Sequence, residues 1–239
     1  MMSLSRRRVG AILRKELREY RRSRSIVPTM GAVPLLFVLV PLIESTTQTA
    51  STLRQYPLLL YLLGVPAIVP VVLAGYAVAG ERQQGTLEPV LTTPIRSQEL
   101  VLAKTLAALV PSLAISYAWY GVVAAGVALL ARPGVPSALL RAPEVVALLL
   151  FTPLLASWSI WIGIAISSRL NDARAAQQLG SLASLPTIAV TILIVADVIP
   201  ATLALALVLA VALLLLDGLG WRIMTAMFDR ERLVTGTSS

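Results

Sequence analysis

Residues 80–104 read GERQQGTLEPVLTTPIRSQELVLAK and form the longest polar interruption of an otherwise apolar chain. Six of their side chains are charged, namely Glu81, Arg82, Glu88, Arg96, Glu99 and Lys104. A charged side chain at the centre of a bilayer costs about 2.5–3.5 kcal/mol on insertion scales. We therefore expect this stretch to lie in water, between two membrane spans.

The same stretch predicts a short capped helix. Thr86 follows Gly85 as an N-cap, because its hydroxyl accepts a free N–H of the first turn. Glu88 lies in that turn, where the helix dipole favours an anion. The helix ends before Pro94, since the residue preceding a proline is disfavoured in the α conformation. A second helix begins at Ser97, so the stretch is typical of a docking element for a cytoplasmic partner.

Composition places the rest of the chain in a membrane. Of its 239 residues, 57% are hydrophobic and 13% are charged, and the mean hydropathy is +0.82, which is typical of membrane proteins. The net charge is +8, and because the basic residues border apolar runs, they favour a membrane surface over nucleic acid. The absence of cysteine and histidine excludes disulfides, thiol nucleophiles and histidine bases.

Six apolar runs predict an all-α membrane protein with six transmembrane helices. They cover residues 27–43, 57–79, 105–131, 145–166, 179–196 and 201–220. We accordingly divide the chain into an amphipathic cytoplasmic helix at 1–26, a membrane domain at 27–220 and a cytoplasmic tail at 221–239.

The first segment, 1–26, carries nine basic residues. Its apolar residues recur at helical spacing, so it is expected to lie in the headgroup plane of an anionic leaflet. A cleaved signal peptide is the alternative, although residues 47–50 (TQTA) match the small-residue cleavage pattern poorly.

Basic residues also predict the orientation of the six spans. An even number of spans puts both termini on one side of the membrane. Of the 20 basic residues, only Arg54, Arg132 and Arg141 then fall on the opposite side. The positive-inside rule therefore places both termini and the 80–104 loop in the cytoplasm, with the chain in the cytoplasmic membrane.

With this topology in place, the motifs resemble those of a known family. Residues 81–88 (ERQQGTLE), the Thr93-Pro94 step and residues 99–104 (ELVLAK) are similar to the signature of ABC-2-type transporter permeases. Residues 15–19 (KELRE) and 228–233 (FDRERL) resemble the family's N-terminal helix and tail, the tail being nearest the sodium-efflux-like branch. The resemblance covers essentially the whole chain, with Ala103 where the family usually has glycine.

The resemblance implies the permease subunit of an ATP-binding cassette exporter that moves an unidentified substrate. Two such subunits pair, as a homodimer or a heterodimer, and each docks on an ATPase subunit that binds ATP and Mg²⁺. The short helix becomes the coupling helix, and its expected contacts are Glu81, Gly85, Thr86, Leu87, Glu88, Val90 and Leu91. The sequence agrees, because it holds no Gly-x-x-x-x-Gly-Lys-Ser/Thr loop. No catalytic residue, cofactor or metal site is expected on this chain.

Polar side chains within the spans suggest a substrate path. The predicted span interiors hold no charge, because Glu44, Lys104, Asp197 and Asp217 lie near predicted span ends, so ion coupling is disfavoured. Neutral candidates for the path are Ser112, Ser116, Tyr120, Ser157, Trp161, Ser184, Thr187 and Thr191. The alternative is that these hydroxyls bond their own helix or a neighbouring one.

Prolines also recur inside the spans, at Pro34, Pro66, Pro70, Pro111, Pro153 and Pro186. They suit a bundle that rocks between two openings, but kinked helices are equally common in static membrane bundles.

Two other functions remain open at this point. One is a membrane scaffold that recruits a cytoplasmic ATPase without transport. The other is a membrane-embedded enzyme, for which Lys104 and Asp217 are the charged candidates near the inner span ends.

Overall fold

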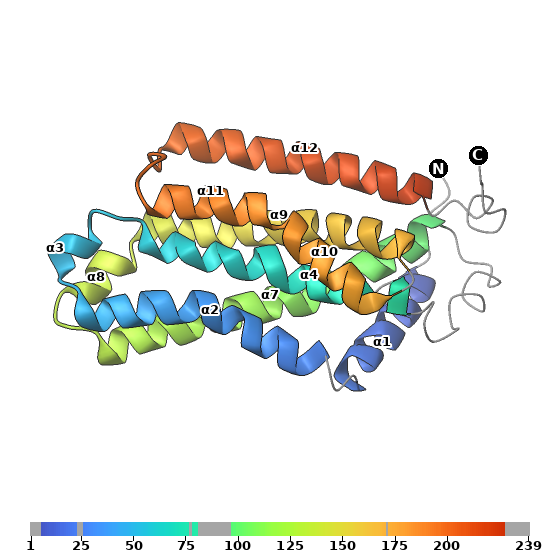
Figure 1. Ribbon diagram of the computed structural model, residues 1–239, viewed down its shortest axis with the longest axis horizontal. Helices are drawn as coiled ribbons and strands as arrows, with labels where there is room; N and C mark the ends of the chain where they lie inside the picture. The colour runs from blue at the N-terminus through green and yellow to red at the C-terminus, as the bar shows by residue number, and fades with distance from the viewer. Residues whose placement is uncertain (1–5, 23–25, 77, 81–96, 171, 228–239) are drawn as a thin grey trace.

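The computed structural model describes residues 6–22, 26–76, 78–80, 97–170 and 172–227, and every regular element within these ranges is a helix. The helices form an elongated bundle (Figure 1). The expected coupling residues, from Glu81 to Leu91, and the tail from residue 228 onward lie outside the described residues.

The described elements follow one another as α1 (Arg6–Arg22), α2 (Ile26–Thr47), α3 (Ala50–Leu53), the 3-10 helix η1 (Leu58–Leu63), α4 (Gly64–Tyr76), α7 (Ser97–Leu130), α8 (Val135–Leu139), α9 (Ala142–Arg169), α10 (Ala173–Ala183), α11 (Leu185–Val195) and α12 (Leu203–Met227). Among them, six segments are long and apolar enough to cross a membrane: Met30–Thr47, Leu58–Tyr76, Gln98–Leu130, Ala142–Arg169, Ala173–Val195 and Leu203–Met227. The predicted six-span all-α fold is thus confirmed.

The bounds of all six spans differ from those of the expected runs, and three differences bear on the site. The second begins as the 3-10 helix η1 before α4. The fifth is divided at Ser184 into α10 and α11, just before Pro186, which cannot donate a backbone hydrogen bond. The sixth continues beyond residue 220 to Met227. Trp221 therefore lies inside α12, and Asp217 lies ten residues before the end of that helix.

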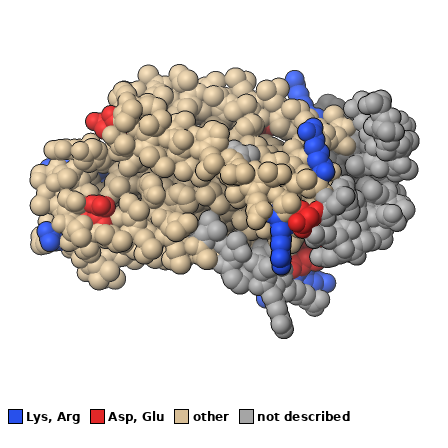
Figure 2. All heavy atoms as spheres, viewed as in Figure 1, with Lys and Arg blue, Asp and Glu red and all other residues tan. Residues whose placement is uncertain are grey.

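The two ends of the bundle differ from its middle. The helix α1 and the last turns of α12 lie at one end, and α3 and α8 lie at the other (Figure 1). On the face shown in Figure 2, acidic and basic side chains gather toward both ends, while uncharged side chains cover the band between them. An apolar band between charged ends is the surface expected of a protein that spans a bilayer.

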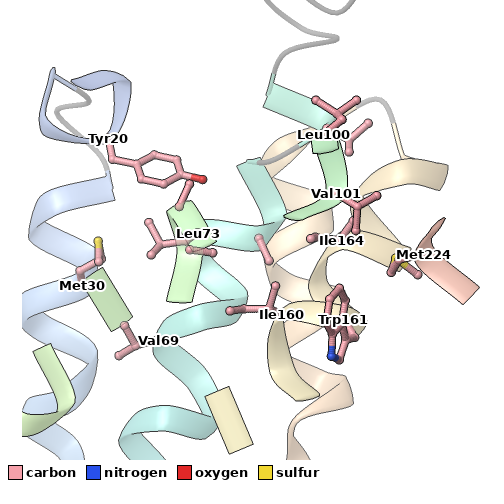
Figure 3. Packing of buried hydrophobic residues seen from close by; sticks show 14 of the residues in the cluster. Tyr20, Met30, Val69, Leu73, Leu100, Val101, Ile160, Trp161, Ile164 and Met224 are labelled. Atoms are coloured by element: carbon pink, nitrogen blue, oxygen red, sulfur yellow. The ribbon is translucent and has the colours of Figure 1, made fainter. Parts of the chain in front are cut away.

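The second span is the centre of the bundle. Most residues of its segment Leu58–Tyr76 are buried, whereas in α12 only Gly220 and Met224 are buried and the helix packs mainly against α9. The helices α2, α7, α9 and α10 all contact α4. Residues of α4 such as Val69 and Leu73 belong to the largest apolar cluster, shown in Figure 3.

Small residues let two neighbouring helices approach α4 closely. A Cβ added to Gly163 of α9 would lie 2.4 Å from the Ala74 Cβ, and one added to Gly180 of α10 would lie 2.3 Å from the Val71 Cγ1. Helix association in membranes depends on such close van der Waals packing, since lipid is as apolar as the side chains.

Two tyrosines of α7 bond carbonyls that lie four residues before a proline. Pro153 cannot donate to the Leu149 carbonyl, and the Tyr117 hydroxyl donates to that oxygen at 3.2 Å. The Tyr120 hydroxyl donates to the Leu62 carbonyl, at 3.4 Å, in the turn that joins η1 to α4 four residues before Pro66. Prolines are tolerated inside spans where neighbouring helices satisfy the freed backbone groups in this way.

We expect the substitution Gly163→Ala to lower the free energy of unfolding by about 1–3 kcal/mol, because Ala74 must shift to admit the new methyl group. The matched control is Gly121→Ala in α7, where nothing lies within 4 Å of the added Cβ. That variant should be neutral or gain up to about 1 kcal/mol. Thermal unfolding in detergent measures both, and equal midpoints would contradict the close α4–α9 contact.

Candidate functional site

The end of the bundle that holds α1 is built on an amphipathic contact. Val9 and Tyr20 of α1 are buried, and Ile12, Leu13 and Leu17 pack partly buried against the large apolar cluster. Figure 3 shows Tyr20 pointing toward that cluster, near Met30. The apolar stripe that we expected to face lipid headgroups therefore packs against α7 and α2. Contact of α1 with the headgroups stays a prediction.

A buried ion pair crosses this contact. The Lys104 Nζ of α7 lies 3.1 Å from the Glu16 Oε1 of α1, and the two side chains are 1% and 4% exposed. A second pair joins the Arg8 guanidinium to Glu99, at 3.5 Å, and the Glu99 side chain is 1% exposed. Two charged pairs from different turns thus fix both the position and the rotation of α1 on the first turns of α7.

These pairs correct one expectation from the sequence. We expected all of residues 80–104 to lie in water, but Glu99 and Lys104 are buried within the protein. Burial is tolerated because each charge meets an opposite charge on α1. The sequence did hold a sign that Glu16 has a cationic partner. Glu16 shares one helical face with the apolar residues Val9, Leu13 and Tyr20, where an unpaired carboxylate would be costly.

The end of the second span is fixed by Ser167 of α9, which the sequence analysis did not single out. Its hydroxyl accepts from the backbone N–H groups of Val78, at 3.2 Å, and Ala79, at 2.9 Å, and donates to the Gly75 carbonyl at 2.8 Å. The Gln177 side chain of α10 donates to the Val72 carbonyl at 3.1 Å. Both segments that flank residues 81–96 are therefore held by tertiary contacts, one through Ser167 and the other through α1.

The expected substrate-path residues have different environments. The hydroxyls of Ser184 and Thr191 donate to carbonyls of their own helices, at 3.3 and 3.0 Å. The Tyr120 hydroxyl lies 2.9 Å from the hydroxyl of Thr152 on α9. For these three residues the hydrogen bonds follow the alternative interpretation, and a role in the path stays a prediction.

The other five candidates lie on three helices. Ser112 and Ser116 of α7 are buried, and their oxygens have no hydrogen-bond partner in the described part of the chain. Trp161 of α9 is buried against Trp221 of α12, while Ser157 of α9 and Thr187 of α11 are half-buried.

Comparison with known families identifies the fold. The family model described as ABC-2 type transporter matches residues 7–203. The chain belongs to the ABC-2 type transporter family. No curated protein gave a significant match. The resemblance drawn from the 81–104 motif is thereby confirmed, and the matched range includes α1 from its second residue on and both of its ion pairs with α7.

Family membership defines the class of the molecule. An ABC-2 type transporter chain of this kind is a multi-pass membrane protein and the permease component of its transporter, not the catalytic one. The family implies association with an ATP-binding cassette subunit. In this ABC-2 permease, the charged pairs and the Ser167 contacts lie at the two helix ends that flank the expected coupling stretch.

We expect Lys104→Met to lower the free energy of unfolding by about 3–5 kcal/mol, because it removes the ammonium group that pairs with the buried Glu16 carboxylate. The double variant Glu16→Leu with Lys104→Met should recover much of this loss, since it replaces both charges by apolar groups. Thermal unfolding in detergent provides the comparison.

The control for this prediction is Lys15→Met. The Lys15–Glu19 pair lies within α1, and its side chains are 36% and 45% exposed, so its loss should cost less than about 1 kcal/mol. A double variant no more stable than Lys104→Met alone would show that the buried ion pair does not explain the effect.

Proposed function

We propose that this permease is the membrane-spanning subunit of an ATP-binding cassette exporter that moves its substrate across the cytoplasmic membrane. The ATP is hydrolysed, with Mg²⁺, on a separate subunit. Family membership supports the permease role. The observation that carries the coupling is the pair of fixed helix ends on either side of residues 81–96.

The coupling argument is mechanical. If the ATPase contacts Glu81, Gly85, Thr86, Leu87, Glu88, Val90 and Leu91, its movements act on a segment with two anchored ends. At one end Ser167 joins the chain to α4 and α9. At the other end Lys104 joins α7 to Glu16 of α1. Because α4 is the most buried span, a displacement there is transmitted to the helices packed around it.

Charge supports a cytoplasmic position for the α1 end and for both termini. Arg7, Arg14, Arg18 and Arg21 of α1 are exposed and are available to anionic headgroups. At the other end Arg141 forms an ion pair with Glu144 and donates to the carbonyls of Arg54 and Tyr56. That cation is therefore engaged in structural contacts within the opposite end of the bundle.

The alternatives are separated by different observations. An enzyme that uses Lys104 is disfavoured, because the Lys104 ammonium is paired with Glu16 and 1% exposed. A scaffold would bind the same ATPase without moving a substrate, and nucleotide-dependent flux distinguishes it from an exporter. A second permease subunit, identical or not, completes the proposed transporter.

We expect Glu88→Arg and Leu91→Arg each to lower recovery of the ATPase subunit on the tagged permease by about tenfold or more, since each places a cation in the docking contact. The matched control is Glu44→Arg, which makes the same charge change near the far end of α2 and should leave recovery unchanged. Full recovery with both loop variants would contradict docking through this stretch.

Sidedness is tested with single cysteines, because the native chain has none. We expect a membrane-impermeant thiol reagent to label Ser137→Cys, on the exposed face of α8, in intact cells. The same reagent should label Gln84→Cys only after permeabilisation. Labelling of Gln84→Cys in intact cells would place the loop outside and end the coupling proposal.

A further inference from the structure

The sixth candidate span contains a carboxylate, that of Asp217. Asp217 lies ten residues before Met227, the last residue of α12, which is about 15 Å along the helix axis. The whole of α12 is a candidate span. Because the helix extends past residue 220, Asp217 lies inside the sixth candidate span rather than at the end of its helix. An ionisable side chain at such a position is costly to keep and commonly serves binding or transport.

One indole lies beside this carboxylate, and a second lies one helical turn further along α12. Trp161 of α9 lies beside Asp217, and the indole is packed so closely on α12 that a Cβ on Gly220 would lie 2.6 Å from the Trp161 Cγ. Trp221 meets Trp161 edge to face, with ring centroids 6.1 Å apart. Met224, next to Trp161 in Figure 3, is buried on the same side of α12.

Two polar atoms of this group lack a well-formed internal hydrogen bond. The Asp217 Oδ1 and the Trp161 Nε1 are buried and lack a hydrogen-bond partner of good geometry among the described residues. The ion pairs found in that part of the chain do not include Asp217. Arg222 is five residues further along α12, about 140° around the helix, and is exposed. The carboxylate thus lies beside the Trp161 indole, which in turn packs on Trp221, and it forms no ion pair among the described residues.

We propose that Asp217, Trp161 and Trp221 form a carboxylate–indole site that binds an amphipathic organic cation, an apolar molecule with one ammonium or similar positive group. The carboxylate supplies the counter-charge, and the indole faces attract the cation by cation–π interaction. This inference rests on the proposed function only in treating the bound cation as cargo of the permease.

The chemistry of the site favours an organic cation over a metal ion. Ca²⁺ and Mg²⁺ require several oxygen ligands, and the described residues contain no cluster of three acidic side chains that could hold a metal. A single carboxylate in a group with two indoles and the Met224 thioether instead favours an organic cation, whose positive charge is spread over an apolar molecule.

Access to the site is from the side of the bundle. The helix α12 is the least buried span and packs mainly against α9. Asp217 itself is half-buried at that contact. An amphipathic cation dissolved in the adjoining leaflet can therefore reach the carboxylate along the α9–α12 contact without passing through the centre of the bundle.

The test uses the full-length permease, purified in lipid nanodiscs, with two probes of matched size and opposite charge. Tetraphenylphosphonium should bind saturably, and tetraphenylborate should not. We expect Asp217→Asn to weaken tetraphenylphosphonium binding by about tenfold or more, since it removes the buried counter-charge. Trp161→Phe, which keeps an aromatic face, should retain more affinity than Trp161→Leu.

The matched control is Asp197→Asn, an identical change outside the site. Asp197 is exposed and has a φ of 58°, which asparagine adopts readily. The affinity of this variant for tetraphenylphosphonium should therefore equal that of the wild type. Thermal unfolding of every variant shows whether it is folded. The Asp217–Trp161 contact would be merely structural if Asp217→Asn unfolded at a lower temperature with unchanged affinity, and that result overturns the proposal.

Two further outcomes overturn the site. Equal binding of both probes to the wild type would show non-specific partitioning, and no saturable binding of tetraphenylphosphonium would exclude this ligand class. Neither outcome depends on the ATPase, so the proposed cation site and the proposed exporter function are tested by independent results. Loss of cation binding with the ATPase still recovered contradicts the site alone, whereas cation binding without ATPase recovery contradicts the exporter alone.

Discussion

The buried ion pair between Glu16 and Lys104 determines how the N-terminal helix is attached to the membrane domain. Such a pair adds little net stability, because both ions lose their hydration. It penalises other arrangements instead, since any shift of α1 would leave a buried charge unpaired. The neighbouring Arg8–Glu99 pair acts in the same sense. The α1–α7 contact therefore behaves as a single unit at the end of the bundle where the coupling stretch begins and ends.

A second constraint is that a bilayer offers no hydrogen-bond partners to the backbone. This constraint bears most on the central span, because its prolines leave helical carbonyls without their usual backbone donors and the span is surrounded by protein. Side chains from three neighbouring helices bond its carbonyls: Tyr120 from α7, Ser159 and Ser167 from α9, and Gln177 from α10. These bonds, with glycines at the closest contacts, explain why so many helices converge on α4.

The two proposals occupy different parts of the permease. Coupling acts at the end of the bundle, where α4 and α7 are anchored to α9 and α1. The carboxylate–indole site lies within the membrane, at the contact between α9 and α12. The helix α9 links them, because it carries both Ser167 and Trp161. A change in its position would alter the end of the second span and the cation site together.

The sequence by itself determined the six spans, the all-α class and the family, because apolar run length and the 81–104 motif are local properties. Only the tertiary structure decided which polar side chains have partners. Glu16 and Lys104 are 88 residues apart in the chain, and Ser167 reaches Ala79 across a similar separation. The environment of Asp217 likewise depends on where α12 ends and on which face of it meets Trp161. Such pairings depend on how helices pack, which the period of a single helix does not encode.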